Sequence, residues 1–225
     1  MITPSTPVVL VHGLATSSAR TWGENGWLDL LADAGRQTVP IDILGHGTAE
    51  RPHDPAAYAD LEGYIAGRLP DGPVDAVGFS LGARLLLGVA VDEPGRFRRI
   101  VTLGVGRNLF EQSGSDAILR AVEAGGDPTN PVAGYFARLA AHRDADREAI
   151  AACLRAPLRL LTAEECAKIT VPVLVVIGGR DFAGPGEPLV DALPDARLVV
   201  LPGADHFSTP KDFGAIDATL RFLEG

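Results

Sequence analysis

The sequence feature that most constrains this chain's fold is Gly78-Phe79-Ser80-Leu81-Gly82, which lies between two apolar stretches. Residues 74–77 are typical of a buried strand, and residues 81–91 are nearly all apolar, as in a helix packed against a sheet. A serine between such a strand and such a helix occupies a sharp, strained turn, where flanking glycines avoid collisions. The pattern predicts a strand–turn–helix unit that presents the Ser80 hydroxyl beyond the strand. The simpler alternative is a serine that only caps the helix.

The rest of the chain alternates predicted strands with predicted helices. Short apolar runs predict strands at residues 8–11, 38–41, 99–103, 171–177 and 197–201. Helical spacing predicts helices near residues 27–32, 58–69, 188–193 and 213–223. This alternation indicates an α/β fold with a mainly parallel sheet and helices on both faces. Residues 108–168 carry only helical or turn signals, so we expect a small helical cap there, inserted into a core of residues 1–107 and 169–225.

Composition excludes several classes of function. A net charge of −9 argues against binding nucleic acid or an anionic membrane, and no stretch approaches the roughly 18 apolar residues that span a bilayer. The first residues lack the basic start and long apolar core of a signal peptide. Cys153 and Cys166 have neither the number nor the spacing of a disulfide framework or a metal site. We expect a reduced, cytoplasmic protein without metal or cofactor, and its oligomeric state stays open.

Five motifs occur in a fixed order along the chain. They are Val11-His12-Gly13-Leu14, Asp42-Ile43-Leu44-Gly45-His46-Gly47, the Ser80 motif, Val176-Ile177-Gly178-Gly179-Arg180-Asp181 and Gly203-Ala204-Asp205-His206-Phe207. Together they resemble the α/β-hydrolase superfamily over almost the whole chain. The resemblance implies an α/β-hydrolase fold. Because the two antiparallel strands that often precede the family's first parallel strand are missing here, we expect a sheet of about six strands.

Ser80 needs a base to become a nucleophile, and the base needs a third group to orient it. His206 follows the last predicted strand in a flexible loop, so it can approach the carboxyl ends of the strands, where ligands collect in open parallel sheets. Asp181 follows the strand before it, and the chain order Ser, Asp, His matches the family's triad. Asp181 could instead form a local Asx turn. The strand end at residues 104–106 offers no competing carboxylate.

The oxyanion formed on an attacked carbonyl needs N–H donors already in place. The residue after the nucleophile, Leu81, supplies one backbone N–H, and the resemblance implies Leu14 as the other. Three phenylalanines adjoin the catalytic candidates and are expected to line the substrate pocket: Phe79, Phe182 and Phe207. Other aromatic residues, Phe136 among them, are interpreted as core.

The sequence thus predicts a serine hydrolase that needs no cofactor and acts on a small-molecule carboxylic ester or thioester. Ser80 attacks, His206 transfers the proton and Asp181 orients the histidine. Two alternatives use the same residues: a low-turnover binding or receptor-like protein, and a lyase or C–C bond hydrolase. The sequence does not separate them.

Overall fold

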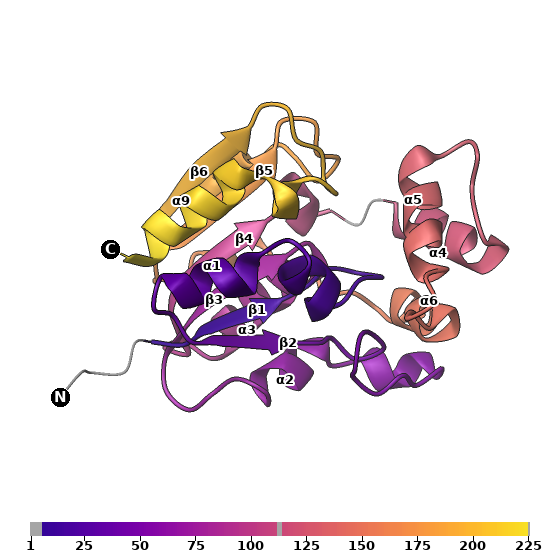
Figure 1. Cartoon of the computed structure of the whole chain (residues 1–225), viewed down its shortest axis with the longest axis horizontal. Helices are drawn as coiled ribbons and strands as arrows, with labels where there is room; N and C mark the ends of the chain where they lie inside the picture. The colour runs from indigo at the N-terminus through magenta and orange to yellow at the C-terminus, as the bar shows by residue number, and fades with distance from the viewer. Residues whose placement is uncertain (1–5, 112–113, 225) are drawn as a thin grey trace.

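The computed structural model describes residues 6–111 and 114–224, and its centre is one sheet of six parallel strands. The strands are β1 (Val8–Val11), β2 (Thr38–Ile41), β3 (Val74–Phe79), β4 (Phe97–Leu103), β5 (Val173–Gly178) and β6 (Ala196–Leu201). Their order across the sheet is β2-β1-β3-β4-β5-β6, with all neighbours parallel (Figure 1). The predicted fold class is confirmed, including the number of strands.

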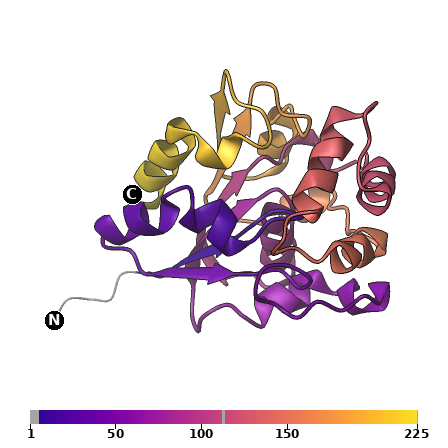
Figure 2. The same ribbon diagram turned by 45° about the vertical axis from the view of Figure 1, so that its right-hand side comes forward.

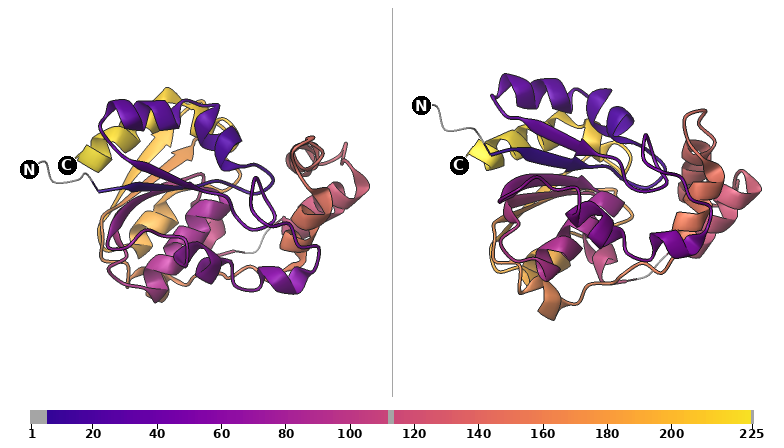
Figure 3. Two further views of the ribbon diagram at one scale, coloured as in Figure 1. Left: turned by 60° about the horizontal axis from the view of Figure 1, so that its bottom comes forward. Right: turned by 90° about the horizontal axis from the view of Figure 1, so that it is seen from below.

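Helices cover both faces of this sheet (Figure 3). One face carries α1 (Trp27–Asp33) and α9 (Phe213–Glu224), and the other carries α2 (Leu61–Ala66), α3 (Leu81–Asp92) and α8 (Glu187–Ala192). Side chains of β1 alternate between the two apolar clusters, because successive residues of a strand point to opposite faces. β1, β3 and β5 are buried along their whole length, and burial on both faces explains why β1 and β5 are continuous apolar runs rather than alternating ones.

Short elements complete the core. They are the helical turns η1 (Ala19–Gly23), η2 (Pro55–Tyr58), η3 (Arg107–Leu109) and η4 (Thr209–Lys211), and the one-turn helix α7 (Ala163–Cys166). The helix expected over residues 58–69 is shorter in the structure, since η2 ends at Tyr58 and α2 begins only at Leu61. Between them, the Asp60 side chain accepts a hydrogen bond from the Gly63 N–H and caps α2. A capping aspartate therefore interrupts the apolar periodicity.

Three helices lie together beyond the carboxyl ends of the strands (Figures 1 and 2). They are α4 (Ser115–Ala124), α5 (Pro131–Ala140) and α6 (Arg147–Arg155). Each contributes one large buried side chain to a separate apolar cluster, namely Val122, Phe136 and Ile150. We propose that these helices form the cap. Leu161 and Cys166 pack into the main core, so the last part of the segment at 108–168 belongs with the sheet.

A histidine links this cap to the core. His53 Nε2 lies 3.1 Å from Asp146 Oδ2, and His53 Nδ1 lies 3.0 Å from Glu148 Oε2 at the start of α6. The hydrogen bond with Asp146 raises the pKa of His53 above its ordinary value of 6.5, and the opposing effect of desolvation does not cancel it. The His53 side chain therefore holds the cap best when it is protonated.

We expect His53→Gln to lower the melting temperature slightly in acid and not in base. Because the pKa of His53 is raised by folding, the stabilisation is fully present below about pH 6.5 and is lost as pH rises through the raised pKa. Calorimetric scans at about pH 5 and about pH 9 measure the difference in melting temperature between wild type and variant. An equal difference at both pH values would show that protonation of His53 contributes nothing to stability.

Candidate active site

Ser80 lies at the sharp turn between β3 and α3. Its backbone has φ of 51° and ψ of −114°, a strained conformation for a residue with a side chain. Ser80 is the N-cap residue of α3, yet its side chain makes no capping hydrogen bond. Its hydroxyl instead donates to His206 Nε2 at 2.9 Å. The hydroxyl is thus directed towards a potential base and away from the helix.

Two glycines allow this turn through close approach of backbone atoms. A Cβ at Gly78 would lie 2.5 Å from the Cα of Ala83, in the first turn of α3. A Cβ at Gly82 would overlap the carbonyl oxygens of Val11 and His12 at the end of β1. The first glycine therefore seats the helix on its own strand, and the second seats it against the neighbouring strand.

His206 and Asp181 complete a chain of hydrogen bonds that begins at Ser80. His206 Nδ1–H donates to Asp181 Oδ1 at 2.9 Å, and Oδ2 lies 3.1 Å away. The side chains of His206 and Asp181 are 2% and 0% exposed. A carboxylate at Nδ1 fixes the proton there, so the lone pair of Nε2 faces Ser80 Oγ. Asp181 also accepts from the Ala183 N–H at 2.8 Å, so the Asx turn that was the alternative for Asp181 exists together with the contact to His206.

Two backbone N–H groups beside Ser80 are open to a ligand. In residues 6–111 and 114–224, neither the Leu14 N–H nor the Leu81 N–H donates a hydrogen bond. The Leu81 N–H is at the positive end of α3, and the loop of Leu14 packs closely on Ser80, since a Cβ at Gly13 would lie 3.2 Å from Ser80 Cβ. Both predicted oxyanion donors therefore come from segments that meet at the serine.

The motif at residues 42–47 holds the loop after β1, which carries Leu14. His12 Nδ1–H donates to the Gly13 carbonyl at 2.7 Å, and His12 Nε2 accepts from the Ile43 N–H at 3.1 Å. Asp42 accepts from the Ser18 N–H at 2.8 Å, which joins the loop after β2 to the loop after β1. These contacts fix the segment that carries Leu14.

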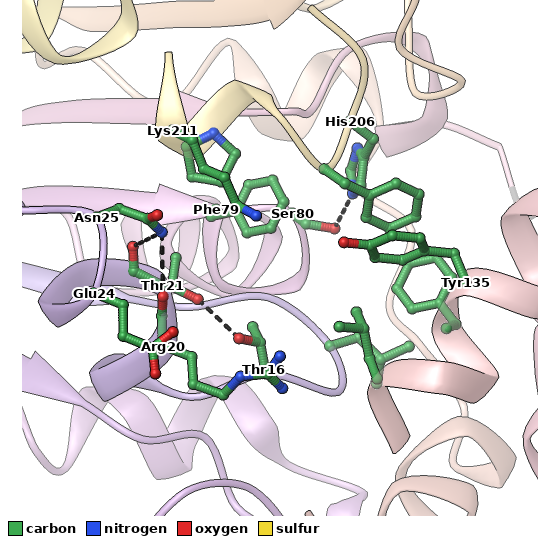
Figure 4. Close-up of a pocket in the computed structure, with 15 residues that line it drawn as sticks. Thr16, Arg20, Thr21, Glu24, Asn25, Phe79, Ser80, Tyr135, His206 and Lys211 are labelled. Atoms are coloured by element: carbon green, nitrogen blue, oxygen red, sulfur yellow. Dashed lines mark hydrogen bonds between the residues drawn. The ribbon is translucent and has the colours of Figure 1, made fainter. Parts of the chain in front are cut away.

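Two cavities meet at Ser80. The first has a volume of about 100 Å³ and is lined by His206, while the second has a volume of about 140 Å³ and is lined by Leu81. Leu14, Ser80 and Phe136 line both. Figure 4 shows the first cavity, where a polar group lies on one side of Ser80 and Tyr135 of the cap on the other. That group comprises Thr16, Arg20, Thr21, Glu24 and Asn25.

Aromatic rings surround His206. The ring centroids of the three predicted pocket residues, Phe79, Phe182 and Phe207, lie 5.1, 4.3 and 5.4 Å from that of His206. Phe79 and Phe207 line the first cavity, and Phe182 lines the second. Phe136, which was expected in the core, lines both cavities. The sequence pattern predicts only that its side chain is buried, and no sequence signal tells where α5 docks.

The two cysteines are poor candidates for a second nucleophile. Both are buried and free, and burial raises the pKa of Cys153 to about 12 and that of Cys166 to about 11. Within the described residues, no group of three or more His, Cys, Asp or Glu side chains could hold a metal ion. The helices of that same part of the chain include none with the length and apolar character needed to cross a membrane.

An open parallel sheet with a serine at the turn after β3 is typical of α/β hydrolases, and comparison with known families gives the same result. The model of the alpha/beta hydrolase family matches residues 8–216. The chain belongs to the α/β hydrolase family.

The similar proteins cover between half and all of the chain. It is 31% identical to a pimeloyl-[acyl-carrier protein] methyl ester esterase of Neisseria meningitidis serogroup B, across 97% of this chain and 93% of that protein. It is 32% identical to a 2-hydroxy-6-oxo-2,4-heptadienoate hydrolase of Pseudomonas putida, across 50% of this chain and 42% of that protein. An esterase structure from Exiguobacterium antarcticum superposes with a TM-score of 0.78 at 18% identity, covering 100% of this chain and 94% of that one.

Proposed function

We propose that this protein hydrolyses a small carboxylic ester through a covalent intermediate on Ser80. The observation that carries the proposal is the continuous chain of hydrogen bonds from Ser80 through His206 to Asp181, whose last two side chains are buried from water. The name of the Neisseria relative, a methyl ester esterase, also supports an ester as substrate.

The reaction follows from this geometry. His206 Nε2 takes the proton as Ser80 Oγ attacks the ester carbonyl, and the negative oxygen is stabilised by the N–H groups of Leu14 and Leu81. His206 then gives the proton to the departing alkoxide as the C–O bond breaks. Water, activated by the same nitrogen, cleaves the acyl-enzyme and releases the acid. Asp181 stabilises the imidazolium at both steps.

A second candidate is hydrolysis of a C–C bond. The relative from Pseudomonas putida, which aligns with half of this chain, is named a hydrolase of 2-hydroxy-6-oxo-2,4-heptadienoate, a name that contains no ester. The same serine and histidine would serve, but the group released would be a carbon acid. A third candidate, a receptor that rarely turns over, keeps the same residues. The three candidates therefore differ in the bond that is cleaved and in the number of turnovers.

A chain-length series of p-nitrophenyl esters tests the proposal. We expect many turnovers per enzyme molecule and an optimum at short acyl chains, because the second cavity measures about 140 Å³. Absorbance of p-nitrophenolate reports the rate. A single burst without further turnover would favour the receptor, and no reaction with any ester would contradict the proposal.

A further inference from the structure

Arg84 is a buried cation that has no anionic partner among residues 6–111 and 114–224. It lies in the first turn of α3, its residue is 9% exposed, and no carboxylate oxygen of the described residues lies within 4 Å of its guanidinium. Nη1 donates to the Asn108 carbonyl at 2.6 Å, while Nη2 is 3.4 Å from the Leu109 carbonyl and 3.5 Å from that of Arg159. Nε has no partner. Neutral carbonyls hold the group in place and leave its charge uncompensated.

The charge is present at neutral pH. Burial lowers the pKa of Arg84 to about 10, and the more distant Glu62 carboxylate opposes that effect. A buried charge is costly unless an opposite charge accompanies it. Such a residue in a cavity beside a nucleophile points to a charged ligand.

Arg84 lines the second cavity, whose other walls are mostly apolar: Leu61, Leu81, Ile118, Phe136, Leu154, Leu158 and Phe182 are among them. The acidic residue there, Glu111, is exposed and pairs with Arg107 at 3.6 Å. The second cavity therefore combines apolar walls with one buried positive charge.

The two cavities receive different parts of an ester. His206 lines the first cavity and not the second. The leaving alcohol must receive its proton from His206 Nε2, so the alcohol occupies the first cavity. The acyl group then occupies the second cavity, on the side of Arg84.

We propose that the acyl group of the substrate ends in a carboxylate that pairs with Arg84, so that the substrate is a monoester of a short dicarboxylic acid. This rests on the proposed ester hydrolysis and specifies its substrate class. The backbone N–H of Arg84 donates to the Ser80 carbonyl at 3.1 Å, so the two residues are one helical turn, about 5.4 Å, apart on α3. Because both line the second cavity, a short dicarboxylic acid fits between them. The apolar walls contact its methylene groups, and the carboxylate supplies the missing negative charge.

Monomethyl esters of succinic, glutaric, adipic and pimelic acids test this, each beside the methyl ester of the monocarboxylic acid of equal length. We expect the wild-type kcat/KM to be about tenfold to hundredfold higher for the best half-ester than for its neutral match. Arg84→Met is expected to remove this preference while hydrolysis of the neutral ester changes by no more than a few-fold. The matched control Arg197→Met, at an exposed position on β6, should keep the preference.

Three results would overturn the inference. They are a wild-type enzyme with no preference for the carboxylate, a variant that keeps the preference, and an Arg84→Met protein that folds but loses both substrates equally. If the variant does not fold, competitive inhibition of the wild type decides. Free glutarate or adipate must inhibit more strongly than the matching monocarboxylate. Hydrolysis of neutral esters without any carboxylate effect refutes this inference alone, whereas no hydrolysis of any ester refutes the proposed function.

Discussion

Ser80→Ala is expected to lower kcat/KM for p-nitrophenyl esters by a factor on the order of 10³ or more. The substitution removes the one oxygen that lies 2.9 Å from His206 Nε2, and with it the covalent route. Backbone donors remain, so a small residual rate over water is expected. Steady-state kinetics with the best ester of the chain-length series measures the loss.

Covalent labelling gives this prediction a second readout. A fluorophosphonate should add one phosphonyl group to the wild type and none to Ser80→Ala, as seen by intact-protein mass. Ser18→Ala is a matched control, since the buried Ser18 hydroxyl has no hydrogen-bond partner among the described residues. It should keep both activity and labelling. A near-wild-type rate in Ser80→Ala would exclude Ser80 as the nucleophile.

Asp181→Asn is expected to lower kcat/KM by about 10³ to 10⁴. The asparagine amide can donate to His206 Nδ1, which moves the ring proton to Nε2. In that tautomer the nitrogen facing Ser80 can no longer accept its proton. The loss therefore arises from chemistry and not from a missing contact, because asparagine has nearly the same shape as aspartate.

Asp205→Asn is the control for this prediction. Asp205 adjoins His206 in sequence, but its carboxylate accepts hydrogen bonds from the N–H and hydroxyl of Ser208. Kinetics of both variants, with circular dichroism to check folding, should show a large loss at Asp181 and a small one at Asp205. Losses of equal size would contradict the role proposed for Asp181.

Much of the fold was predictable because the inner strands β1, β3 and β5 are buried along their whole length. Residues 8–11 and 173–177 are unbroken apolar runs, and in the structure both lie inside the sheet with helices on each side. The Ser80 motif was informative for a related reason. Its glycines are required by backbone contacts to Ala83 and β1, and such contacts leave a clear sequence pattern.

The cavities were not predictable, since they depend on how the cap docks. The spacing of α5 shows that Phe136 is buried but not that it covers Ser80. Arg84 shows the same limit more sharply. A single charge in an apolar helix gave no signal, because the carbonyls that surround it come from Asn108, Leu109 and Arg159, which are distant in sequence.

The two cavities that meet at Ser80 impose an order on a turnover of the proposed reaction. While the alcohol occupies the first cavity, it takes the place beside His206 Nε2 that the attacking water needs. Departure of the alcohol empties that cavity and leaves the acyl group anchored in the other. Water then enters from the side that the alcohol has left and meets the base already in position. In the proposed reaction, the alcohol therefore has to leave before the acid can form.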